Sequence, residues 1–150
     1  MKKTLVSGAI MMSFIMMSCE KETSSPSSSA DTQTSFLTAK EWKLISLVHS
    51  NDTTPEHEII EECQKDDIEV FTTSGYYLSK TGGKACNDEQ PNSIDTMRWQ
   101  FNPSKTVIYA YWNSLENKID LKINTLSSNE LVLELSEANG SDKTVATYTH

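Results

Sequence analysis

The chain has 150 residues, a formal net charge of -8, and charged side chains at 23% of its positions. This length leaves room for one domain of moderate size. An acidic chain without a cluster of Lys and Arg is a poor partner for nucleic acid or for an anionic lipid surface, so we expect neither kind of binding.

The first 18 residues are typical of a secretory signal peptide. Lys2 and Lys3 give a positive start, and an apolar run follows from Leu5 to Met17. At about 13 residues this run is too short to cross a bilayer as a helix. The segment Met-Met-Ser-Cys that ends at Cys19 resembles the lipobox of bacterial lipoproteins. We therefore predict a signal peptide over 1–18 and acylation of Cys19, for example by palmitate, so that covalently attached acyl chains would hold the protein to a membrane.

Residues 19–35 have a different composition from both their neighbours. After Cys19 they are rich in Ser and Thr, show no periodicity, and hold no apolar side chain larger than Pro. Such a segment is typical of a flexible tether. We expect the folded domain to occupy 36–150.

In that domain, short apolar runs alternate with turn residues, as in an antiparallel meander. A helix-start signal, Thr54-Pro55-Glu56, predicts a short helix over 57–63, and a polar stretch over 81–96 predicts a long loop. Gly75 is available for a hairpin turn. Eight strands are expected, at 41–49, 68–72, 76–80, 97–101, 106–112, 119–124, 130–136 and 144–149. Closing this meander into an up-and-down barrel removes its two exposed edges.

Two cysteines remain once Cys19 is assigned to the anchor. Cys63 and Cys86 form an even pair in an exported chain, so we predict a disulfide between them. A metal site built on these cysteines is the alternative, but neither has a second Cys or a His at ligand spacing. The carboxylates from Glu61 to Glu69 lack the spacing of a calcium loop. We expect Asp66 and Asp67 to be turn residues whose side chains accept backbone N–H groups, and we expect no metal or cofactor.

Catalytic machinery is not evident in the sequence. Nucleophilic catalysis needs a Ser or Cys beside a base and an oxyanion hole. The chain contains no Gly-x-Ser-x-Gly segment, and the three histidines, His49, His57 and His150, have no evident nucleophile beside them. We therefore predict that the protein is not an enzyme.

Several residues spread over the domain carry a resemblance to a known family. They are Trp42, Cys63 with Asp66-Asp67 and Phe71, Gly75-x-Tyr77, Cys86, and Trp99-x-Phe101. Together they resemble the lipocalin-like domain of Bacteroidetes lipoproteins, which implies an all-β, eight-stranded antiparallel barrel carried on a lipid anchor in the outer membrane, facing the periplasm or the cell surface. The Gly-x-Trp of true lipocalins is replaced here by Lys40-Glu41-Trp42.

Two functions are compatible with such a barrel. The first is binding of a small apolar or amphipathic molecule by a monomer, with ligand contacts from Trp42, Phe71, Tyr77, Trp99, Phe101, Tyr109 and Tyr111. The second is a filled barrel whose loops contact another protein of the envelope. Large apolar residues on one side of the clearest strands, such as Met97, Leu121 and Leu133, predict that any internal space is small.

Overall fold

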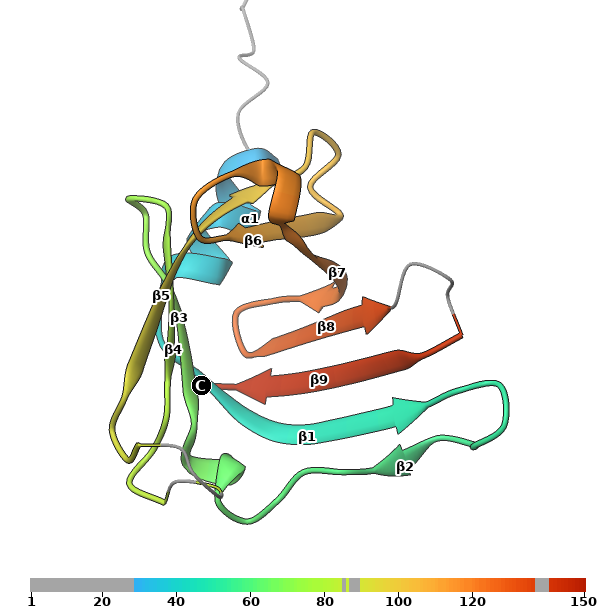
Figure 1. Cartoon of the computed structure of the whole chain (residues 1–150). Helices are drawn as coiled ribbons and strands as arrows, with labels where there is room; N and C mark the ends of the chain where they lie inside the picture. The colour runs from blue at the N-terminus through green and yellow to red at the C-terminus, as the bar shows by residue number, and fades with distance from the viewer. Residues whose placement is uncertain (1–28, 85, 87–89, 137–140) are drawn as a thin grey trace, which may run out of the picture.

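The computed structural model describes residues 29–84, 86, 90–136 and 141–150. These residues form one α-helix, nine strands and two short 3-10 helices (Figure 1). In chain order they are α1 (Ser29–Thr38), β1 (Trp42–Ser50), β2 (His57–Glu58), η1 (Gln64–Asp66), β3 (Ile68–Phe71), β4 (Tyr76–Lys80), β5 (Ile94–Phe101), β6 (Val107–Tyr111), η2 (Leu115–Asn117), β7 (Ile119–Leu126), β8 (Glu130–Ser136) and β9 (Lys143–Thr149).

Eight of the strands close into an antiparallel barrel. Their order is β1-β3-β4-β5-β6-β7-β8-β9, and β1 also pairs with β9 from Lys43 opposite Thr149 to Ser50 opposite Lys143. Figure 1 shows this closing pair side by side, with β8 next to β9. The short β2 adds to β1 outside the closed ring. The predicted all-β barrel of eight antiparallel strands is confirmed.

Alternation along the strands determines which side chains fill the barrel. In β5, for example, Met97 and Trp99 are buried while Arg98 and Gln100 are exposed. This period of two is the geometry of a strand with one face toward the core. The fully or almost fully buried core residues are Leu37, Trp42, Leu44, Phe71, Met97, Trp99, Ile108, Ala110, Leu121, Leu131, Leu133, Ala146 and Tyr148.

The turn predicted at Gly75 is present, and it joins β3 and β4 into a hairpin. This residue has a φ of 80°, which is accessible to glycine without a steric penalty. Its N–H donates to Thr72 O, and Thr72 N–H donates to Tyr76 O. The hairpin fixes the register in which Phe71 lies opposite Tyr77.

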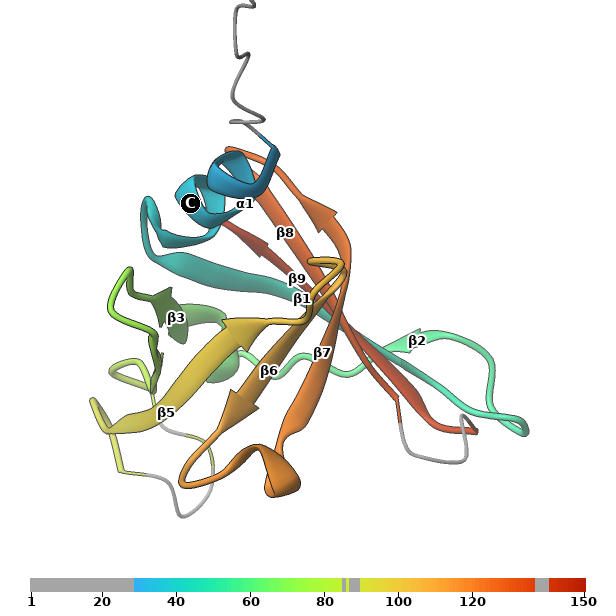
Figure 2. The ribbon, with the colours of Figure 1, turned by 90° about the horizontal axis from the view of Figure 1, so that it is seen from above.

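Helix α1 occupies residues 29–38, which include part of the segment expected to be a tether. Leu37 is fully buried, and the Trp42 indole N–H donates to Leu37 O at 2.9 Å. The helix contacts β3 and β7, which lie on opposite sides of the eight-stranded ring. Seen from above in Figure 2, α1 lies over the C-terminal end of the chain, and Trp42 links the two segments because its ring also packs against His150. The helix therefore closes one end of the barrel, and tertiary contacts override the weak local helix signal of a Ser- and Thr-rich sequence.

The predicted helix over 57–63 is wrong. His57 and Glu58 instead pair with β1, and the Glu58 carboxylate accepts hydrogen bonds from Leu47 N and Ser46 Oγ. The expected helix start is a turn held by Asn51, whose Oδ1 accepts from Thr53 N and Thr54 N. Pairing with the edge of β1 is thus more favourable than the helix that Pro55 and the acidic residues after it would favour locally.

Some predictions fall outside the described residues. These include the signal peptide over 1–18, Cys19, the first part of the tether up to residue 28, and most of the final turn at 139–141. Among the described residues, no helix is long and apolar enough to cross a membrane.

Candidate functional site

Five of the seven expected ligand-binding residues come together inside the barrel. Trp42, Phe71 and Trp99 belong to the buried core, and Tyr77 and Phe101 pack against it. Phe71 stacks on Tyr77 with ring centroids 4.7 Å apart, and its edge meets Trp99 at 5.7 Å. The barrel interior is therefore lined by aromatic rings on the side formed by β3, β4 and β5.

The other two expected residues, Tyr109 and Tyr111, lie on the outer surface. In β6 they alternate with the buried Ile108 and Ala110, which point inward. Tyr111 lies directly opposite Arg98, and the Arg98 guanidinium lies 4.0 Å from the centre of the Tyr76 ring on the next strand. The two tyrosines consequently cannot contact a ligand inside the barrel.

The end of the barrel interior next to α1 is largely occupied by side chains. Leu37, Trp42, Phe71, Ile108 and Leu131 are the large residues that are completely buried. At the opposite end, Leu135 is 36% exposed although it shares a strand face with the buried Leu131 and Leu133. The predicted packing of large apolar residues is present, and it thins toward the end of the barrel away from α1, which we call the mouth.

A row of residues crosses the inner face from the mouth into the core. Trp42, Glu69, Ser79 and Asp95 lie directly opposite one another on β1, β3, β4 and β5. Their exposure falls along the row: Asp95 is exposed, Ser79 and Glu69 are half-buried, and Trp42 is fully buried. The pairing of β5 with β6 ends at Arg98, which lies opposite Tyr111, so no residue of β6 lies opposite Asp95. The row therefore runs from the exposed carboxyl of Asp95 at the mouth to the buried indole of Trp42 in the core.

Glu69 is the polar residue that stands out inside this aromatic lining. Its Oε1 accepts a hydrogen bond from Ser79 Oγ at 3.1 Å, whereas its Oε2 is buried and has no hydrogen-bond partner. Burial raises the pKa of the Glu69 carboxyl to about 7, and the nearby hydroxyl groups of Tyr77 and Ser79 offset only part of this effect. Glu69 therefore changes its charge near neutral pH.

Two tyrosines share the environment of Glu69. Burial raises the pKa of the Tyr77 hydroxyl, and the negative charge of Glu69 adds to that rise. Burial and Glu69 act in the same direction on the pKa of Tyr148. Both phenols consequently remain neutral and can serve as hydrogen-bond donors to a carboxylate or to a ligand.

The mouth holds two hollows. One of about 310 Å³ is lined by His49, Leu135, Ser136, Asp142 and Thr144, and another of about 340 Å³ is lined by Lys118, Ile119, Asp120, Leu135 and Ser136. They share Leu135 and Ser136, so they adjoin each other across β8. Volumes of this size suit a small molecule rather than a long acyl chain.

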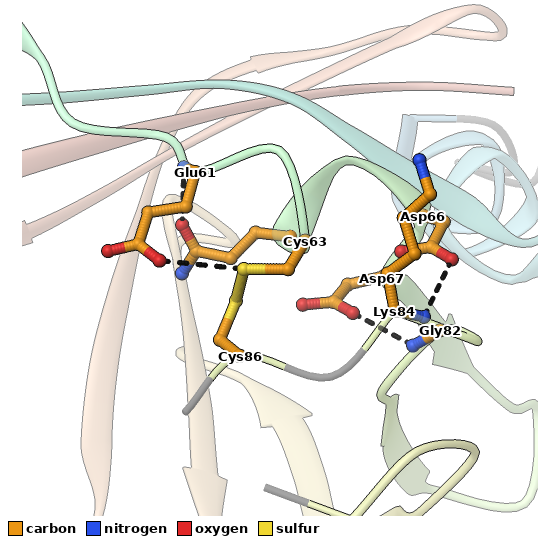
Figure 3. Close-up of a disulfide and its surroundings, with 8 residues drawn as sticks. Glu61, Cys63, Asp66, Asp67, Gly82, Lys84 and Cys86 are labelled. Atoms are coloured by element: carbon orange, nitrogen blue, oxygen red, sulfur yellow. Dashed lines mark hydrogen bonds between the residues drawn. A yellow bond between two sulfur atoms is a disulfide. The ribbon is translucent and has the colours of Figure 1, made fainter. Parts of the chain in front are cut away.

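The disulfide predicted between Cys63 and Cys86 is present (Figure 3). It joins the segment before β3 to the loop between β4 and β5, and the same loop is held by both aspartates. Gly82 N–H donates to Asp67 Oδ1 and Lys84 N–H donates to Asp66 Oδ2. The aspartates accept backbone N–H groups as expected, but from this distant loop and not from a local turn before β3.

The packing in this corner requires a glycine at position 82. A Cβ atom there would lie 2.2 Å from Asp66 Cγ. A third hollow, of about 410 Å³, adjoins the same loop and includes Ile68, Lys80 and Ile94. With both sulfur atoms joined, neither cysteine offers the thiolate that a metal site would need. The disulfide and the two aspartates therefore stabilise the packing of the β4–β5 loop against the segment before β3.

The inner-face positions of Glu69, Ser79 and Asp95 are not among the predictions made from the sequence. The signal was available for Glu69, since it is two residues from Phe71 and a strand places such positions on the same face. Asp95 was assigned to a loop, because the buried residues of its strand begin only at Met97.

No family model, no curated protein and no solved structure matches this chain.

Proposed function

We propose that this protein is a lipid-anchored, lipocalin-like binding protein of the cell envelope that takes up a small molecule at the mouth of its barrel. The observation that carries the proposal is the asymmetry of the interior. Helix α1 closes one end, whereas the other end has adjoining hollows over a partly exposed Leu135. Closed barrels with one open end are suited to hold one small ligand.

The anchor is supported by the sequence alone, through the apolar leader and the lipobox-like segment at Cys19. Only nine residues separate Cys19 from the start of α1 at Ser29. Nine residues reach at most about 30 Å when fully extended. An anchored protein would therefore keep α1, at the closed end of the barrel, within about 30 Å of the outer membrane, on its periplasmic or its outer side.

Replacing Cys19 by serine is expected to abolish labelling of the protein with radioactive palmitate, because serine offers no thiol for the thioether bond to the lipid. The protein should also stay at its precursor length on a denaturing gel. A double replacement of Cys63 and Cys86 by serine is the control, and it should still be labelled. Label in the Cys19→Ser protein would disprove the anchor.

Binding is tested by native mass spectrometry of the full chain extracted in mild detergent. We expect a co-purifying small molecule in a one-to-one complex. A Thr144→Trp variant, which fills the hollow beside His49, should lose this mass, whereas Tyr109→Ala on the outer surface should keep it. Long-chain fatty acids are expected to bind weakly because the interior is largely filled. Absence of any adduct, or one that survives Thr144→Trp, would argue against the mouth as the site.

The second candidate is a protein-interaction module. It is favoured by one feature, the loop between β6 and β7, where Trp112 is 57% exposed and Leu115 is 42% exposed. Exposed large side chains of this kind are enriched where proteins meet. Loss of a partner on Trp112→Ala, together with an empty barrel in the mass spectrum, would favour this function over small-molecule binding.

A further inference from the structure

Two of the three histidines of the chain meet at the mouth of the barrel. His49, near the end of β1, lies directly opposite His57 on β2, and their rings meet edge to face with centroids 5.7 Å apart. Directly opposite residues of paired strands point to the same face of a sheet, so both imidazoles lie on one side of these strands. Thr144 of β9 lies opposite His49 on its other side, and Figure 1 shows β2, β1 and β9 side by side.

Asp142, directly before β9, adds a carboxylate to this pair. Its Oδ1 lies 3.7 Å from His49 Nε2, and the two side chains are partly exposed, at 37% for Asp142 and 27% for His49. Both residues line the hollow of about 310 Å³ beside Thr144. The hollow therefore gives a dissolved ion, together with the water molecules that it retains, access to both side chains.

The contacts of both rings leave Nε2 as the nitrogen with a free electron pair. His57 Nδ1 lies 3.1 Å from Pro55 O, which can only accept, so Nδ1 carries the proton. His49 Nδ1 lies 3.3 Å from Thr144 Oγ1, which can accept the proton of that ring, and Nε2 then turns its electron pair toward Asp142. A histidine that binds a metal usually donates its other N–H to such an outer partner.

The spacing of these groups is close to that of ligands on one metal ion. On a tetrahedral Zn²⁺ with bonds of about 2.0–2.2 Å, two ligand atoms lie about 3.3–3.6 Å apart and two imidazole centroids about 5–6 Å apart. The corresponding values are 3.7 Å from His49 Nε2 to Asp142 Oδ1 and 5.7 Å between the two rings. As the described side chains lie, the three ligand atoms are not all within 4.8 Å of one another, so the exposed His57 side chain has to turn toward the ion.

An ion pair on the opposite face links the strands that carry these residues. Lys143 lies opposite Ser50, and its Nζ lies 3.3 Å from Oε1 of Glu56, the residue before His57. This pair spans β1 and connects the start of β9 to the start of β2. It therefore limits how far His57 and Asp142 can move apart.

We propose that His49, His57 and Asp142 bind a divalent transition-metal ion of the zinc type at the mouth of the barrel. Imidazole ligands select Zn²⁺, Cu²⁺ or Ni²⁺, whereas Ca²⁺ and Mg²⁺ prefer oxygen ligands alone. The three residues are far apart in the sequence, and only strand pairing brings them together. This inference goes beyond the proposed function, and it stands whether or not the barrel also holds an organic molecule.

The test is calorimetric titration of Zn²⁺ into the full chain in mild detergent at pH 7.5. The protein is purified without a polyhistidine tag and treated with a chelator, and it should bind one ion per chain. His49→Gln, His57→Gln and Asp142→Asn should each weaken binding at least about tenfold, because loss of even an outer partner of a metal ligand costs about 10–100-fold. Circular dichroism checks that each variant is folded.

The chain offers two matched controls. His150, the third histidine, packs against Trp42 at the closed end, so His150→Gln should bind Zn²⁺ as the native protein does. Glu61 lies with Cys63 and Cys86 in another group of ligand-type atoms, and Glu61→Gln should also leave binding unchanged. Titration with Co²⁺ gives a second readout, since its visible absorption reports the ligands directly and should change in His57→Gln.

The possible results each decide the proposal. Absence of Zn²⁺ binding, or an affinity that neither His49→Gln nor His57→Gln lowers, would overturn the site. Binding that is lost in Glu61→Gln but retained in His49→Gln would overturn it too, because the ion would then lie beside the disulfide. The co-purifying small molecule is detected in chelator-treated protein, so its presence or absence tests the proposed function separately.

Discussion

Replacing Trp42 by alanine is expected to lower the free energy of unfolding by about 3–5 kcal/mol. Trp42 is completely buried, donates a hydrogen bond to Leu37 O, and packs against the tilted ring of His150 with ring centroids 3.9 Å apart. Its side chain thus joins α1, β1 and the end of the chain. Removing the indole leaves a cavity where these segments meet, and it leaves the Leu37 carbonyl without its donor.

The three tryptophans of the chain provide an internal control for this prediction. Trp99 is 8% exposed, and its indole N–H donates to Thr72 O, so Trp99→Ala should cost a similar amount. Trp112 is 57% exposed, and Trp112→Ala should change stability by no more than about 0.5 kcal/mol. Urea denaturation followed by far-ultraviolet circular dichroism measures all three. A cost below about 1 kcal/mol for Trp42→Ala would contradict the closed, packed end of the barrel.

The strands were predictable because each of them carries its own signal. In β7 and β8, apolar and polar residues alternate almost without exception, and short turns join neighbouring strands. Sequential pairing then leads directly to the closed meander. The hairpin at Gly75 was predictable for the same reason, since its conformation depends on a single residue.

The helices were not predictable from local sequence. The segment 29–38 is polar apart from Ala30, Phe36 and Leu37, and only the barrel end that receives Leu37 makes a helix favourable there. The segment after Pro55 carries a helix-start signal, yet β1 offers it a free edge and Glu58 caps that edge with its carboxylate. In both places the deciding contacts are distant in sequence.

The candidate site was predictable in part. Aromatic residues at inner positions of β3, β4 and β5 follow from alternation, and they include Phe71, Tyr77 and Trp99. Tyr109 and Tyr111 were misplaced because β6 reads as an apolar run on both faces, and only the register with β5 shows that Ala110 is the inward residue. Glu69 was considered as a possible calcium ligand rather than as an inner-face carboxyl, which only strand pairing reveals.

The stability of the native protein is expected to fall as the pH rises from about 4.5 to about 7, and Glu69→Gln should remove most of that fall. The pKa of Glu69 is raised from 4.5 to about 7 by burial, so the folded protein retains a proton that the unfolded chain releases across this interval. Below pH 4.5 both states are protonated and the folded protein has no penalty. Above pH 7 the penalty is complete.

Each pKa unit of difference corresponds to about 1.4 kcal/mol, so the native protein should lose up to about 3 kcal/mol between these pH values. Glutamine keeps the shape of the side chain without a charge, so Glu69→Gln should be more stable than the native protein at pH 7.5 and similar to it at pH 4.5. Glu58, Glu62 and Glu134 have lowered pKa values, and their contributions therefore change below this interval. Urea denaturation of the native protein, Glu69→Gln and the control Glu116→Gln, which changes an exposed carboxyl on η2, measures the difference at several pH values. Parallel curves for the native protein and Glu69→Gln would show that Glu69 is solvated in the folded barrel, and the inner-face position of its carboxyl would then be incorrect.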